Sequence, residues 1–181
     1  MFLKELCELN GVSGDEHAVR NFLKEKITPY ADDLTVDTMG NLIVLKKGQN
    51  PGKKLMISAH MDEVGLIISG ITDKGFLRFK TVGGIDTRVL ISKKVVIGEK
   101  KIPGVIGMKA IHLQKRSERE TVPEIQSLFI DIGASSEEAK ELVSIGEYAS
   151  FDTQYAEIGS GKIKAKALDD RAGCAVLLEL I

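Results

Sequence analysis

A long series of short apolar runs is the feature that most constrains the fold of this chain. Between residues 66 and 108, runs rich in Val, Ile and Leu alternate with turns that contain Gly, Asp or Lys. Such regular spacing is typical of the strands of small antiparallel barrels. A further strand is expected at 127–133. The segment at 135–143 should form a helix, because it begins with serine and carries acids in its first turn. The polar segment 114–126 is expected to be a loop.

Helical patterns precede this series. Apolar residues at helical spacing predict a first helix near the start and a second over residues 15–27. Ser13 and Glu16 have the spacing of a capping box for the second helix, and Pro29 follows its end. Two helices are therefore expected before the series of strands.

The remaining segments favour an α/β fold. Two short strands are expected at 34–37 and 41–48, and a third at 55–59, where a lack of alternation indicates a strand covered on both faces. Residues 167–181 should leave a strand, turn and enter an apolar helix. A helix that is apolar on all sides normally lies inside a larger body. The sequence therefore favours a truncated protein, or one completed by another chain.

Composition excludes several classes of protein. The chain has 25 basic and 26 acidic residues, few aromatic residues and no tryptophan, which gives no basis for binding nucleic acid. No apolar run is long enough to span a membrane, and the start is too short and too charged for a signal peptide. Cys7 and Cys174 are expected to be small buried residues without a disulfide. We expect a cytoplasmic protein that binds neither nucleic acid nor membrane.

His60 and Asp62 follow directly after the apolar run 55–59. In open α/β sheets, ligands bind beyond the carboxyl ends of strands. On an extended backbone the two side chains share one face, so the histidine could bind a metal and the acid could orient it. The alternative is a core histidine bonded to a neighbour, with Asp62 capping a turn.

A second acidic position stands at Asp169 and Asp170. Adjacent carboxylates are unfavourable unless a positive group lies nearby, and this group is either Arg171 or a divalent metal. A carboxylate can bridge two metal ions, because its two oxygens diverge. Asp169 would then bridge, and Asp170 would point elsewhere or bond to Arg171. Small residues at Ala172 and Gly173 would let the following helix pack closely.

Several motifs together resemble the M42 family of metallo-aminopeptidases, which includes glutamyl and deblocking aminopeptidases. The two most informative are ISAHMDEVG at 57–65 and ALDDRAG at 167–173. The others appear in the expected order along the chain: LCELNGVSGDEHAVRNFL, DTMGNLIV, VGGIDTR, GVIGMKAIH and IDIGASSEEA. The combination is specific, although each motif alone is weak.

The resemblance implies a fold and an assembly. Residues 1–65 and 158–181 would form part of a mixed-sheet, zinc-peptidase-like (phosphorylase/hydrolase-like) α/β domain. Residues 66–157 would form an inserted PDZ-like β-barrel used for dimerisation. Members of the family assemble as homo-oligomers, from dimers to twelve-subunit tetrahedral shells.

The resemblance also implies a chemistry. Two divalent metal ions, zinc or cobalt, would remove N-terminal residues from peptide substrates. His60 would bind one metal, Asp169 would bridge both, and Asp62 would be the catalytic acid that supports His60. The peptide bond between Asp169 and Asp170 would be cis. Histidine and aspartate ligands also suit manganese.

The other residues of the family's site have no counterpart in these 181 residues. The catalytic glutamate and the remaining metal ligands lie in a C-terminal half, in chains roughly twice as long. Glu179 does not match the catalytic position, His17 is expected on the surface, and His112 belongs to a motif of the barrel. The 181-residue chain is therefore expected to be inactive alone.

Two alternatives are a non-catalytic oligomerisation module and one chain of a two-chain enzyme. A glycosidase is disfavoured. It needs carboxylic acids on either side of a sugar ring, whereas Asp169 and Asp170 are adjacent and should point differently.

Overall fold

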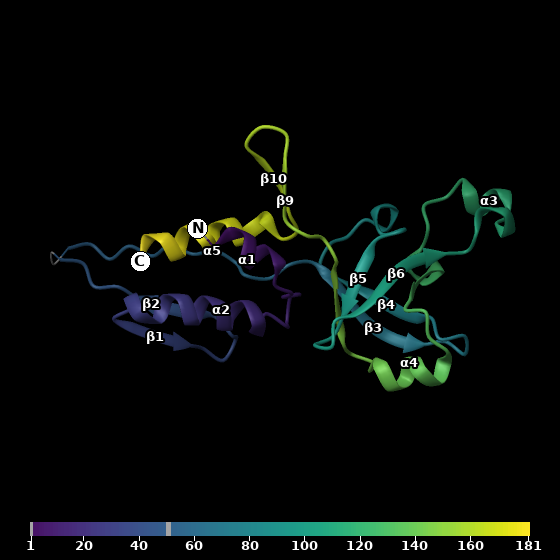
Figure 1. Ribbon diagram of the computed structural model, residues 1–181, viewed down its shortest axis with the longest axis horizontal. Coiled ribbons are helices and arrows are strands. Elements are labelled where there is room, and N and C mark those ends of the chain that lie inside the picture. The colour runs from purple at the N-terminus through teal and green to yellow at the C-terminus, as the bar shows by residue number, and fades with distance from the viewer. Residues whose placement is uncertain (1, 50–51) are drawn as a thin grey trace. The chain divides into compact units, whose positions relative to one another are not determined.

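The protein has a mixed α/β fold that contains a closed barrel of six strands (Figure 1). The computed structural model describes residues 2–49 and 52–181. The chain divides into two compact units, Met1–Glu63 with Thr153–Ile181, and Val64–Asp152. Among the described residues, no helix is long and apolar enough to cross a membrane.

The second unit is built on the barrel. Every pairing is antiparallel and the strand order is β3-β4-β7-β6-β5-β8, which confirms the predicted small antiparallel barrel. The strands are β3 (Gly65–Ile71), β4 (Leu77–Val82), β5 (Lys94–Ile97), β6 (Ile102–Met108), β7 (Leu128–Asp131) and β8 (Tyr148–Phe151). Alternate side chains point inward, as along β4, where Leu77 and Phe79 are buried and their neighbours are exposed.

Short helices connect these strands. They are η2 (Thr87–Val89), η3 (Ile111–Leu113), α3 (Arg116–Arg119), η4 (Ile125–Ser127) and α4 (Ser136–Leu142). The predicted helix after β7 is confirmed as α4. Its capping box joins Ser135 and Glu138 through a 3.3 Å bond to the Ser135 hydroxyl and a 2.8 Å bond to the Glu138 carboxylate. The segment predicted as a polar loop contains α3 and most of η4.

The first unit consists of helices and two β-hairpins. Its elements are α1 (Leu3–Glu8), α2 (His17–Ile27), η1 (Thr28–Tyr30), β1 (Asp33–Val36), β2 (Leu42–Leu45), β9 (Ala156–Ile158), β10 (Lys162–Lys164) and α5 (Leu168–Leu180). A core of Leu6, Val19, Leu23, Cys174 and Ala175 joins α1, α2 and α5. Cys7 and Cys174 are buried and free, as expected.

The prediction of a strand at 55–59 is wrong. Residues 52–62 are not part of any sheet, and Leu55 and Met56 are 83% and 89% exposed. A strand requires a partner for its backbone N–H and C=O groups. Within the described residues, 55–59 have no strand partner, and the next strand-like pairing is a parallel bridge between Val12 and Glu63.

Two local predictions at helix starts are also wrong. Ser13 and Glu16 do not form a capping box, because α2 begins only at His17 without a side-chain cap. Residue 167 does not end a strand. Ala167 has a left-handed backbone (φ 53°), and α5 begins at the next residue.

Candidate functional site

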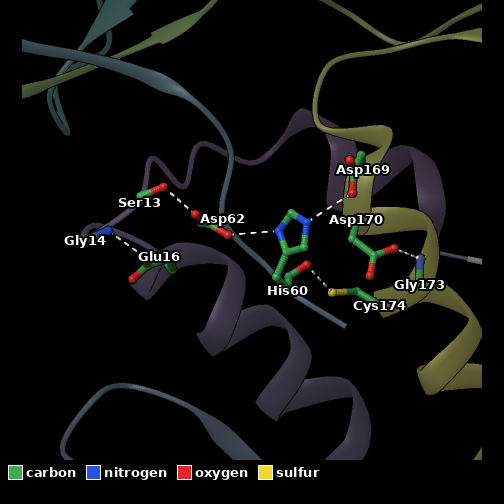
Figure 2. A network of polar contacts seen from close by, with 9 residues as sticks. All are labelled: Ser13, Gly14, Glu16, His60, Asp62, Asp169, Asp170, Gly173 and Cys174. Atoms are coloured by element: carbon green, nitrogen blue, oxygen red, sulfur yellow. Dashed lines mark hydrogen bonds and ion pairs between the residues drawn. The ribbon is translucent and has the colours of Figure 1, made fainter. Parts of the chain in front are cut away.

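The His60 side chain lies between two carboxylates (Figure 2). Its Nδ1 is 2.9 Å from Oδ1 of Asp62, and its Nε2 is 3.0 Å from Oδ1 of Asp169. His60 and Asp62 come from the extended segment before the barrel, whereas Asp169 comes from the first turn of α5, 109 residues from His60. The structure thus brings together the three residues singled out in the sequence.

The two contacts favour a protonated ring. Burial of His60 opposes its charge, but hydrogen bonds to Asp169 and Asp62 outweigh this effect and raise its pKa above the usual value. The pKa of Asp62 is lowered, chiefly because the Ser13 hydroxyl donates to its carboxylate. When protonated, the ring can donate one hydrogen bond to each acid.

Ser13 is a member of this site that the sequence did not indicate. Its hydroxyl donates to Oδ2 of Asp62, and His60 contacts the other oxygen of the same carboxylate. Both oxygens of Asp62 are therefore occupied, which fixes the plane of the carboxylate. No local signal could identify Ser13, because its spacing to Glu16 equally matches a capping box.

The turn at the start of α5 separates the two adjacent acids. The Asp169–Asp170 peptide bond is cis, as the family resemblance implies. The Asp169 side chain is 96% exposed, whereas Oδ1 of Asp170 accepts a 3.0 Å hydrogen bond from the backbone N–H of Gly173. A Cβ atom at residue 173 would overlap this carboxylate, so a larger residue there would force the Asp170 side chain to shift.

Arg171 does not neutralise the two acids through a hydrogen bond. Its guanidinium is fully buried, and Nη1 donates to the carbonyl oxygens of Leu6 and Leu9 at 2.5 and 3.3 Å. Of the two alternatives for Asp170, a bond to Arg171 or another orientation, the second is observed, because its carboxylate accepts from Gly173 instead.

A thiol also joins His60 to α5. Sγ of Cys174 donates to the backbone carbonyl of His60 at 3.3 Å. Burial raises the pKa of this thiol to about 11, although Arg171 opposes the shift, so the group stays protonated and able to donate at neutral pH. The backbone of His60 is thereby held against the same helix that carries Asp169.

The donor atoms suit a divalent metal. Zinc lies about 2.0–2.2 Å from nitrogen and oxygen ligands, and tetrahedral geometry then separates two ligands by about 3.3 Å. His60 Nε2 and Asp169 Oδ1 lie 3.0 Å apart, close to this separation, so the two atoms are spaced as two ligands of one ion would be. Within residues 2–49 and 52–181, no group of three or more His, Cys, Asp or Glu side chains is arranged to hold a metal.

A small polar cavity of about 140 Å³ lies beside His60. Its wall includes Glu16, Asn41 and Asp62.

The two histidines other than His60 lie outside this site. His17 is exposed on α2 with Nδ1 2.7 Å from Asp15, and His112 is exposed in η3.

Comparison with known proteins finds a family model and relatives that match this chain along most of its length. The family model for M42 glutamyl aminopeptidase matches residues 40–181. The lysyl aminopeptidase of Pyrococcus furiosus is 32% identical over 183 residues, which are 98% of this chain and 52% of that protein. The chain thus spans about half the length of the curated relatives that it matches along its full length.

Solved structures have the same fold. The TET1 peptidase of Pyrococcus horikoshii, which can assemble into a tetrahedron or a large octahedral shell, is 40% identical with a TM-score of 0.85. The match covers 98% of this chain and 53% of that one. An endoglucanase of Thermotoga maritima is 46% identical with a TM-score of 0.86, over 99% of this chain and 53% of that chain.

Proposed function

The chain belongs to the M42 family of glutamyl aminopeptidases, and we propose that it is the N-terminal part of a binuclear metal-dependent aminopeptidase. The complete protein would remove N-terminal residues from peptide substrates. The observation that carries this proposal is the contact of His60 with both Asp62 and Asp169, across 109 residues of sequence.

Each residue would have a separate role. His60 Nε2 and the Asp169 carboxylate would hold the metals, zinc or cobalt, with Asp169 shared between the two ions. The metals would polarise the scissile carbonyl and lower the pKa of a bound water. Asp62 would accept a hydrogen bond from Nδ1 of His60, which fixes the ring and raises the basicity of Nε2. Ser13 would hold Asp62 in this orientation.

The 181-residue chain should be inactive by itself. A water activated by two metals still needs a general base and a full set of ligands. The described residues bring only His60 and Asp169 to the place where a metal fits. A non-catalytic oligomerisation module and one chain of a two-chain enzyme are the alternatives.

The fold and assembly follow the same proposal. The first unit would be part of a zinc-peptidase-like domain, and the barrel would be a PDZ-like dimerisation domain. The protein would be a cytoplasmic homo-oligomer, a dimer or a dodecamer. The shells formed by the similar Pyrococcus horikoshii peptidase support this proposal.

Glycoside hydrolysis is not proposed, despite the similar endoglucanase. A glycosidase holds two carboxyl groups toward one sugar from opposite sides. Here Asp169 faces His60, whereas Asp170 turns back to accept a bond from Gly173. The two acids do not face a common space.

The test compares residues 1–181 with the complete natural protein that carries them. Both are assayed on a series of aminoacyl-p-nitroanilides with added Zn²⁺ or Co²⁺. We expect metal-dependent activity in the complete protein alone, lost in His60→Ala and Asp169→Asn. His17→Ala is the matched control, since His17 is an exposed histidine that also contacts an aspartate. Full activity of His60→Ala, or no activity in the complete protein, would contradict the proposal.

A further inference from the structure

A second polar cluster lies in the core of the first unit, apart from the exposed acids. It consists of Glu63, Lys166 and Arg171. The side chains of Lys166 and Glu63 are only 8% and 4% exposed, and Arg171 is fully buried. Burial of charged groups is costly unless they are paired, so the partners of this cluster show what it holds together.

Lys166 makes three directed contacts. Its ammonium group donates to Oε1 of Glu63 at 2.5 Å, to the carbonyl of Leu9 at 2.9 Å and to Oδ1 of Asn10 at 3.1 Å. An ammonium group has three donors, and each of them has an acceptor here. Lys166 stands three residues before Asp169 and is anchored to residues 9 and 10.

Arg171 anchors the other end of the same turn. Its guanidinium donates to the carbonyl oxygens of Leu6 and Leu9, so Leu9 accepts from both cations. Gly11 leaves room for this side chain, because a Cβ there would lie 2.8 Å from Nη2 of Arg171. The turn 167–170 is therefore fastened on both sides to one short piece of chain.

The same piece of chain holds the His60 side of the site. Glu63, the residue after Asp62, exchanges backbone hydrogen bonds with Gly11 and Ser13 at 2.8 and 3.1 Å. Its carboxylate accepts from the backbone N–H of Gly11 at 3.2 Å. The Ser13 hydroxyl donates to Asp62 itself. Residues 9–13, hereafter the linking segment, thus contact both halves of the candidate site.

We propose that Glu63, Lys166 and Arg171 are positioning residues, which use the linking segment to set the distance between His60 and Asp169. This inference rests on the proposed function. The proposal is supported by the fact that this buried cluster is ionic, since stability alone does not require charged residues there. Apolar residues of similar volume commonly replace a buried ion pair with little loss of stability. Directed bonds to fixed carbonyls define a geometry that apolar packing does not.

The test measures metal binding in the complete natural protein. The main variant is Glu63→Gln/Lys166→Met, which removes both members of the ion pair together and keeps Arg171, whose guanidinium still donates to the carbonyls of Leu6 and Leu9. Lys164→Met is the matched control, because Lys164 is an exposed lysine two residues away in β10. The readouts are the Kd for Co²⁺, the visible absorption spectrum of bound Co²⁺, and the urea midpoint of the metal-free protein.

We expect the double variant to bind Co²⁺ about 10- to 100-fold more weakly, the range seen when residues that orient metal ligands are changed. Its Co²⁺ spectrum should change as well, whereas Lys164→Met should match the unmodified protein in every readout. Asn10→Ala, which removes one acceptor of Lys166 without changing charge, should weaken Co²⁺ binding about twofold to tenfold. It serves as the test if the double variant does not fold.

An unchanged Kd and spectrum in a folded double variant, or in Asn10→Ala if the double variant does not fold, would overturn the proposal. A lower urea midpoint with unchanged binding would show a purely structural role. The proposed function fails separately, if His60→Ala leaves Co²⁺ binding of the complete protein unaltered.

Discussion

At the scale of single residues, His60 lies in surroundings that favour its charged form. Both ring nitrogens contact carboxylates, and these contacts raise its pKa despite the opposing effect of burial. A histidine whose pKa is higher in the folded state than in the unfolded state stabilises the fold when it is protonated. This contribution is complete below about pH 6.5, the unfolded value. It is lost as the pH rises through the folded-state pKa.

The pKa of His60 can be measured by an NMR titration of metal-free residues 1–181. We expect a value above the usual 6.5 or so for histidine. Asp169→Asn should lower it, because the asparagine removes the negative charge that faces Nε2. His60→Ala assigns the His60 resonances, because these are the signals that it removes. Equal pKa values in the unmodified protein and in Asp169→Asn would show that the contact does not persist in solution.

At the scale of the elements, the linking segment is closely packed against α2 and α5. At Gly11, a Cβ atom would lie 2.7 Å from Cγ2 of Val19 on α2 and 2.8 Å from Nη2 of Arg171 on α5. Both side chains are fully buried and cannot move aside freely. Gly11→Ala should therefore lower the free energy of unfolding by about 1–3 kcal/mol, the usual cost of overpacking.

Urea unfolding followed by far-ultraviolet circular dichroism measures this loss. Gly84→Ala is the matched control, since no atom lies within 4 Å of a Cβ there and the residue is exposed. It should change the free energy of unfolding by less than about 0.5 kcal/mol. Equal stability of the two variants would contradict the close packing described for Gly11.

The elements also show which parts of the structure local sequence can predict. The barrel strands, α2 and the cap of α4 were predictable, because periodicity and turn residues act within a few positions. The fate of residues 55–59 was not predictable, because a strand forms only if residues far away in the sequence pair with its backbone. Ser13 was misassigned because a hydroxyl can cap a helix or bind a carboxylate equally well.

The candidate site also contains residues that the sequence could predict and residues that it could not. His60, Asp62 and Asp169 could be proposed from motif resemblance, and the structure brings them into contact. The pairing of Glu63 with Lys166 could not be proposed, because 103 residues separate them and neither lies in a pattern that indicates burial. Only the folded chain shows that the motif LNGVSG supplies acceptors for both cations.

At the scale of the molecule, the main unexplained feature is an apolar groove on the first unit. A cavity of about 320 Å³ is lined by side chains of α2, β2, α5 and the segment at 55–61. In this segment, Leu55 and Ile57, which line the cavity, and the adjacent Met56 are more than half exposed. Contiguous apolar surface of this kind promotes association in water. Residues 1–181 alone should therefore self-associate as their concentration rises.

Light scattering across a concentration series tests this expectation. Leu55→Gln/Met56→Gln should shift the chain toward smaller species, because it removes two of the most exposed apolar side chains beside the groove. Ile111→Gln/Leu113→Gln is the matched control, since these residues are also exposed but belong to the barrel unit. If the groove drives association, the control should behave like the unmodified chain. A monodisperse monomer at every concentration would contradict the prediction, and equal effects of the two variants would assign association to general hydrophobicity instead of the groove.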